Sequence, residues 1–207
     1  MLSDKGPHCR DRDKLMTNDV LPKLSPRVIL LAGPAGAGKS TLGARIAQNS
    51  HWSHISEDTI WDGIGHPPNE PRTPEEELRV QARTIDLVID ALNNRKNVVL
   101  EFVVYHNPPT PIIVYQDAFK ARQIPFIIRV LLPNVEEILR RQKARGRSSD
   151  SDLKARRLNA EHQCSCLSSV YIEPAWRINS TNMSLEEVYL AHFRNIVEAH
   201  ESRPVET

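Results

Sequence analysis

The stretch "RVILLAGPAGAGKST", residues 27–41, joins an apolar run to a loop with three glycines that ends in Lys, Ser and Thr. Residues 33–40 match the pattern G-x-x-x-x-G-K-[ST]. Glycines let backbone N–H groups curve around phosphate oxygens, and a helix that starts in the loop adds its positive dipole end. The stretch therefore predicts a buried strand, a phosphate-binding loop, and a helix that runs to about Gln48.

Each part of the loop has an expected task. Lys39 should reach the β- and γ-phosphates, the Ser40 hydroxyl should bind Mg²⁺, and Thr41 should support the α-phosphate. The candidate nucleotide-binding residues of the loop are Gly33, Pro34, Ala35, Gly36, Ala37, Gly38, Lys39, Ser40 and Thr41.

Outward from the loop, apolar strand signals alternate with helical periodicity, which indicates βαβ units and a parallel sheet. The expected strands are 27–32, 54–56, 97–104, 125–133 and 176–179. Capping boxes at Thr73–Glu76 and Ser184–Glu187 predict two helix starts, the second helix running to about His200. Further helices are expected at 112–122, 134–145 and 152–169, and a loop or broken helix at 59–72. The predicted fold is α/β and doubly wound, with a five-stranded parallel sheet flanked by helices in three layers.

Composition limits the setting. The chain has 207 residues and a formal net charge of +1, so a general attraction to nucleic acid or membrane is not implied. Residues 1–25 are polar and predict a flexible extension before a single domain at 26–207. No apolar run reaches the roughly 18 residues of a membrane span, and no signal-peptide segment is present. Three cysteines make no even disulfide framework, which favours a reducing cytoplasm.

With these motifs the chain resembles the small-molecule and nucleotide kinases of the phosphate-loop class. It is nearest to the group of shikimate and gluconate kinases, chloramphenicol phosphotransferase, zeta toxins and polynucleotide 5′-kinases. The guanine-recognition motif Asn-Lys-x-Asp, which a GTPase would normally have, is absent from the sequence. Besides the loop, the resemblance uses the acid of "ISED" (55–58), the acid of "NVVLEF" (97–102) and the arginines of "LRRQKARGR" (139–147). It implies ATP and Mg²⁺ as cofactors.

The resemblance places a catalytic base at the end of the second strand. Asp58 is the candidate that accepts the proton of the acceptor hydroxyl. Glu57 is its competitor, because strand alternation would point the two carboxylates in opposite directions. Glu101 is an isolated acid in a buried strand, where it would organise Mg²⁺ together with Ser40 or contact the acceptor, or else form a buried salt bridge.

Basic residues at 139–157 predict a lid that closes over the phosphates. Arg141 and Arg145 lie four residues apart on one helix face and are the catalytic candidates, with Arg147 as a nucleotide-binding candidate. A solvated helix face is the alternative interpretation of the same charges.

The acceptor pocket is expected beside the ends of the second and third strands, with Trp61, Arg72 and Tyr105 as substrate candidates. Arg72 would suit a substrate carboxylate, whereas the aromatic rings would suit a stacked base. His162, Cys164 and Cys166 have the spacing H-x-C-x-C, but a helix spreads them around its axis, which disfavours a zinc site.

Together these features predict an ATP- and Mg²⁺-dependent phosphotransferase, a kinase that moves the γ-phosphoryl group to an alcohol group of a small molecule. One alternative is a nucleic-acid end kinase or sugar-nucleotide kinase. The other is a degenerate kinase that binds ATP and acts as a regulatory partner.

Overall fold

A parallel five-stranded sheet forms the centre of the protein. The computed structural model describes residues 27–66, 72–146 and 152–199. The strands follow the order β2-β3-β1-β4-β5, and all paired strands are parallel. Their bounds are β1 (Val28–Ala32), β2 (Trp52–Ser56), β3 (Asn97–Phe102), β4 (Phe126–Leu131) and β5 (Arg177–Ile178). The predicted fold class and parallel sheet are confirmed.

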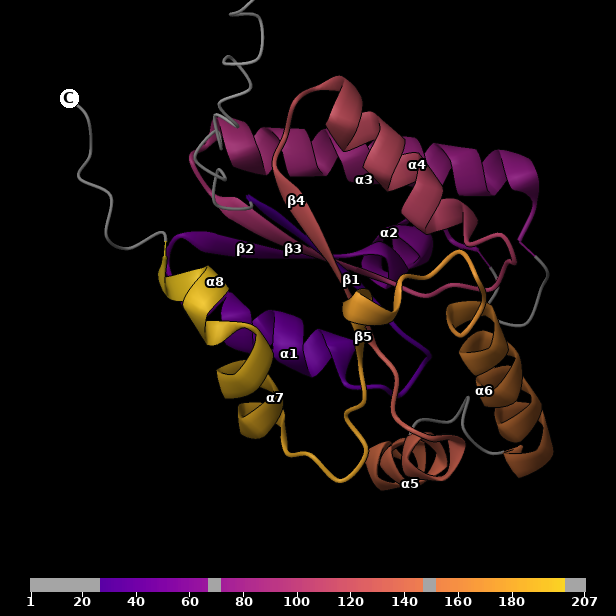
Figure 1. Ribbon diagram of the computed structural model, residues 1–207. Coiled ribbons are helices and arrows are strands. Elements are labelled where there is room, and N and C mark those ends of the chain that lie inside the picture. The colour runs from indigo at the N-terminus through magenta and orange to yellow at the C-terminus, as the bar shows by residue number, and fades with distance from the viewer. Residues whose placement is uncertain (1–26, 67–71, 147–151, 200–207) are drawn as a thin grey trace, which may run out of the picture.

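Helices cover both faces of the sheet and the end at which its strands terminate (Figure 1). One face carries α3 (Pro74–Asn93) and α4 (Thr110–Ala121), and the other carries α1 (Lys39–Ile46), α7 (Leu185–His192) and α8 (Arg194–Glu198). Beyond the carboxyl ends of the strands lie α2 (Glu57–Gly63), α5 (Val135–Arg145) and α6 (Leu153–Leu167). A short 3₁₀ turn, η2 (Pro174–Trp176), precedes β5. Ligands of open α/β sheets bind at this end.

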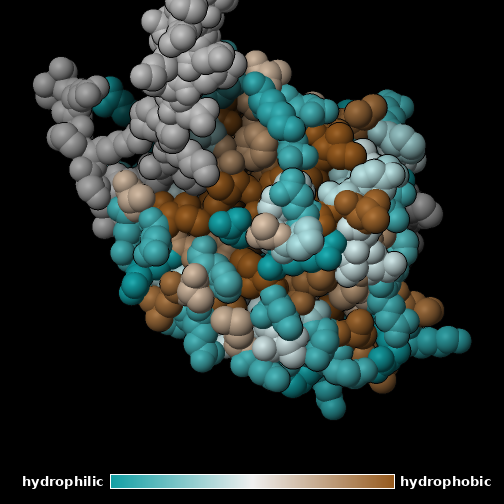
Figure 2. Space-filling model, in the orientation of Figure 1, coloured by the Kyte–Doolittle hydropathy of each residue, from teal (hydrophilic) through white to brown (hydrophobic). Residues whose placement is uncertain are grey.

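The apolar run of β1 is explained by burial on two sides. Val28, Leu30 and Ala32 pack in the core under α3 and α4, whereas Ile29 and Leu31 pack against α1, α7 and α8. All five β1 residues have no exposed surface, as expected of a central parallel strand. In the space-filling view, apolar residues gather between the two helical layers, and the outer helix surfaces are mostly hydrophilic (Figure 2).

Both predicted capping boxes are present. The Thr73 and Ser184 hydroxyls accept the N–H groups of Glu76 and Glu187, whose carboxylates accept the N–H groups of the two caps. These local hydrogen bonds fix where α3 and α7 begin.

Two segments refine the expectation. Residues 57–63 form the short helix α2, which begins before the loop or broken helix expected from 59, and Glu57 and Asp58 in its first turn favour the helix dipole. The expected final helix is broken at Phe193, whose backbone leaves the helical region (φ −127°, ψ −32°). Phe193 and Val197 are both buried in the core.

The expected extension at 1–25 lies outside the described residues. Within the described ranges, no helix combines the length and apolar character needed to cross a membrane.

Candidate active site

The phosphate loop connects β1 to α1. Gly36 and Gly38 have φ values of 93° and 100°, a backbone conformation that favours glycine. Lys39 is buried, and its Nζ donates to the carbonyl oxygens of Gly33 (3.0 Å) and Pro34 (3.1 Å). The ammonium group therefore lies over the loop, at the side where the terminal phosphates of a nucleotide would be held.

The charges around Lys39 come from several parts of the chain. Burial lowers the pKa of Lys39, and the negative charges of Glu101 and Asp58 act against this shift. Arg145 adds a smaller lowering effect on the same pKa. The structure thus brings four of the predicted residues, Lys39, Asp58, Glu101 and Arg145, into one electrostatic cluster.

Glu57 and Asp58 occupy different environments. Glu57 is buried and accepts a hydrogen bond from the Tyr115 hydroxyl, and burial raises its pKa to about 7. Asp58 is exposed. Both residues lie in the first turn of α2, so helix geometry, and not strand alternation, makes their side chains point in different directions. Glu57 is thereby turned into the core, and Asp58 has the freer carboxylate beside the phosphate loop.

Glu101 lies near the carboxyl end of β3, in register with Leu31 of β1 and Ser56 of β2. Only 3% of Glu101 is exposed, yet its pKa is lowered. Burial alone would raise that pKa, but His54, the Ser56 and Ser40 hydroxyls and the Lys39 charge outweigh it. His54 Nε2 lies 3.5 Å from Glu101 Oε1.

The donor set near Glu101 fits a magnesium ion. Among the described residues, Glu101 Oε2 is buried without a hydrogen-bond partner. Carboxylate and hydroxyl oxygens are the ligands that Mg²⁺ prefers, and water completes its coordination. Ser40 and Glu101 could therefore hold this ion, as their positions in the sequence suggest. The described residues contain no group of three His, Cys, Asp or Glu side chains suited to a metal.

The predicted lid arginines have different surroundings. Arg141 donates to the carbonyl oxygens of Ala37 (2.8 Å) and Ser180 (2.8 Å) and pairs with Glu137 (2.7 Å). These contacts brace the phosphate loop against the segment that follows β5. Arg145 is the arginine that affects Lys39, and Arg147 lies outside the described residues.

The acceptor candidates also come together. The guanidinium carbon of Arg72 lies 4.2 Å from the ring centroid of Trp61 and 5.4 Å from that of Tyr105. These residues and Glu57 line a small pocket with a free volume of about 10 Å³. Arg72 also lowers the pKa of Glu57 against the larger effect of burial. The guanidinium of Arg72 and a buried acid thus line the same pocket, an arrangement that the sequence did not reveal.

A larger cavity of about 290 Å³ lies on another side of the phosphate loop. Thr41 and Leu42 of α1, Arg141 of α5, and Met183 and Leu185 before and in α7 contribute to its walls. A cavity with apolar walls and a few polar groups suits a planar base. The sequence showed no motif that recognises the nucleotide base, because the residues of this cavity come from separate segments.

Residues 28–164 match the model of a protein family described as "AAA domain". The chain belongs to this AAA domain family. A comparison of the sequence of this AAA domain protein with curated proteins found no match.

Solved structures share the fold of this AAA domain protein. The tunicamycin resistance protein of Deinococcus radiodurans is 13% identical, with a TM-score of 0.60 and coverage of 87% of this chain and 97% of that chain. Shikimate kinase of Acinetobacter baumannii in complex with shikimate is 20% identical, with a TM-score of 0.55 and the same coverages, 87% and 97%. A gluconokinase of Sinorhizobium meliloti 1021 is 16% identical, with a TM-score of 0.58 and coverages of 86% and 95%. The expected P-loop kinase-like fold is confirmed.

Proposed function

We propose that the protein is an ATP- and Mg²⁺-dependent kinase that transfers the γ-phosphoryl group to an alcohol hydroxyl of a small molecule. The observation that carries this proposal is the convergence of Lys39, Asp58 and Glu101 at the phosphate loop. A loop that only binds nucleotide needs no exposed carboxylate beside Lys39, whereas phosphoryl transfer to a hydroxyl does. The kinase-like fold supports the same class of reaction.

In this proposal the nucleotide base occupies the 290 Å³ cavity, and its phosphates follow the loop toward Lys39. Ser40 and Glu101 would hold Mg²⁺, which would neutralise phosphate charge when bound. Lys39 exchanges its carbonyl partners for phosphate oxygens, and Arg145 offsets negative charge on the transferred group.

The chemical step forms one bond and breaks another. The acceptor oxygen attacks the γ-phosphorus, the bond to the oxygen that bridges the β- and γ-phosphates breaks, and ADP leaves. Asp58 takes the proton of the acceptor hydroxyl. Asp58 is preferred to Glu57, because the Tyr115 hydroxyl already occupies the Glu57 carboxyl and because Asp58 has the larger effect on the pKa of Lys39. The acceptor lies against Trp61, Arg72 and Tyr105.

The test is transfer of labelled γ-phosphate from ATP to a panel of hydroxyl compounds, with the variant Asp58→Asn beside the wild type. The loss of a general base should lower the transfer rate by about 100-fold or more, with ATP affinity nearly unchanged. Asp62→Asn is the matched control, because Asp62 is an exposed acid of the same helix. The mechanism is wrong if Asp58→Asn transfers normally. The kinase proposal is wrong if no hydroxyl compound competes with water.

A further inference from the structure

The backbone N–H and C=O groups of Ala35, inside the phosphate loop, each form a hydrogen bond with a buried glutamine. Its N–H donates to Gln163 Oε1 (2.8 Å), and its carbonyl oxygen accepts from Gln142 Nε2 (2.7 Å). Gln142 and Gln163 are only 5% and 1% exposed. Burial of an amide side chain is costly unless its hydrogen bonds are satisfied, so both contacts are specific parts of the structure. Gln142 belongs to α5 and Gln163 to α6.

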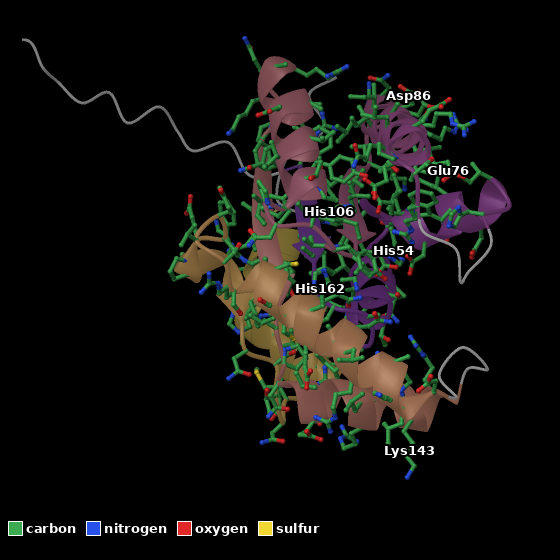
Figure 3. All side chains as sticks on the ribbon, turned by 90° about the vertical axis from the view of Figure 1, so that its right-hand side faces the viewer. His54, Glu76, Asp86, His106, Lys143 and His162 are labelled. Atoms are coloured by element: carbon green, nitrogen blue, oxygen red, sulfur yellow. The ribbon has the colours of Figure 1, made fainter. Side chains whose placement is uncertain are left out.

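The residue before Gln163 reaches a different part of the site. His162 Nε2 lies 2.8 Å from the carbonyl oxygen of Tyr105. A carbonyl can only accept, so Nε2 carries the proton of this bond. Figure 3 labels His162 on α6 and His106, the residue that follows Tyr105. One turn of α6 therefore contacts the phosphate loop through Gln163 and the acceptor pocket through His162.

The link between α6 and Tyr105 has a second component. Although Tyr105 is 36% exposed, desolvation raises the pKa of its phenol, and the Arg72 charge and, to a smaller extent, a hydrogen bond with Gln163 act against this rise. The side chain that receives the Ala35 N–H thus also affects the tyrosine of the acceptor pocket. Phosphoryl transfer depends on placing two substrates within a fraction of an ångström, so a rigid connection between their binding loops has a direct use.

We propose that Gln163 and His162 are positioning residues that couple the phosphate loop to the acceptor pocket through one turn of α6. The proposal rests on the proposed function, since it assigns nucleotide to the loop and acceptor to the pocket. When nucleotide orders the loop, the Ala35–Gln163 bond holds α6, and the His162–Tyr105 bond orders the acceptor side. Neither residue takes part in bond making or breaking.

Hydrogen exchange of the full chain tests this coupling, with the imido analogue of ATP and Mg²⁺ as the probe. In the wild type, the probe should slow exchange in residues 33–42 and also in residues 103–107. In Gln163→Leu and in His162→Ala, residues 33–42 should still respond, whereas the response of 103–107 should fall by about fivefold, the factor that corresponds to one hydrogen bond of about 1 kcal/mol.

Conservative variants separate positioning from general stability. Gln163→Glu keeps an oxygen that accepts the Ala35 N–H, and His162→Gln keeps a nitrogen that donates to the Tyr105 carbonyl. Both should retain the response of residues 103–107. Thermal unfolding identifies variants that do not fold. If Gln163→Leu fails to fold, the comparison of His162→Ala with His162→Gln decides.

The outcomes distinguish the two proposals. A wild type whose residues 33–42 do not respond to the probe contradicts the nucleotide site, and the coupling fails with it. A wild type that responds at 33–42 but not at 103–107 overturns the coupling alone. The coupling is equally overturned if His162→Ala responds like the wild type, or if His162→Gln loses the response as His162→Ala does.

Discussion

Replacing Gly43 by Ala is expected to displace the ring of His54 and disturb Glu101. A Cβ atom at position 43 would lie 2.5 Å from both Cδ2 and Nε2 of His54, closer than non-bonded atoms approach. The same ring lies 3.5 Å from Glu101, the proposed magnesium ligand. Gly43 thus lets α1, the helix of the phosphate loop, approach β2 closely enough for His54 to contact Glu101.

The size of the effect follows from two opposing contributions. Forcing an extra methyl group into a packed core costs about 1–3 kcal/mol. Replacing Gly by Ala inside a helix gains up to about 1 kcal/mol. Gly63, the last residue of α2, provides the matched control, because a Cβ there would have no atom within 4 Å. Gly43→Ala should therefore be less stable than Gly63→Ala by about 1–3 kcal/mol.

Urea unfolding of Gly43→Ala, Gly63→Ala, His54→Ala and the double variant at 43 and 54 measures these free energies. Removing the ring removes the clash, so the cost of Gly43→Ala should largely disappear in the His54→Ala background. Equal stability of Gly43→Ala and Gly63→Ala would refute the packing argument. So would strict additivity of the substitutions at 43 and 54.

Three further predictions concern charged residues. The pKa of Glu57 is raised from 4.5 to about 7, so the folded state binds the proton of this carboxyl more tightly than the unfolded state does. The wild type should therefore lose stability, on the order of 3 kcal/mol, as pH rises from 4.5 to 7. Urea unfolding across that range should show no such loss for Glu57→Gln. Arg141→Ala should lower the free energy of unfolding by about 2 kcal/mol, because it removes hydrogen bonds to Ala37 and Ser180. Arg140 is a largely exposed partner of the same Glu137, so Arg140→Ala should lower the free energy of unfolding by at most about 0.5 kcal/mol. Thermal or chemical unfolding compares the two, and similar losses would contradict the bracing role of Arg141. Lys39→Met should weaken Mg²⁺–ATP binding by about tenfold or more in calorimetry, and unchanged affinity would be inconsistent with the proposed nucleotide site.

The parts of the fold that could be predicted are those determined by neighbouring residues. The apolar β1 and the glycine loop that follows it are contiguous, and so are the capping boxes at Thr73 and Ser184. The start of α2 at Glu57 was not predicted, because the glycines and prolines at 63–71 obscure a short helix that precedes them. The break at Phe193 was missed because no glycine or proline marks it in the sequence.

The same distinction applies to the site. Lys39, Asp58 and Glu101 could be proposed because a motif, or a strand end, fixes each position. The two hydrogen bonds to the backbone of Ala35 could not be predicted, because Gln142 and Gln163 are 107 and 128 residues away and belong to no motif. The wall of the larger cavity has the same origin, since separate segments contribute to it.

The central place of β1 has a consequence for the order in which the chain acquires its structure. Both partners of β1, the strands β3 and β4, follow it in the sequence, and β4 ends at Leu131. During synthesis, the ribosome must therefore release an apolar first strand well before either of its neighbours exists. Unpaired apolar strands are prone to association, and parallel sheets form slowly. The phosphate loop cannot take its final shape until the strands on both sides have arrived, so nascent chains that end before β4 should bind chaperones rather than nucleotide.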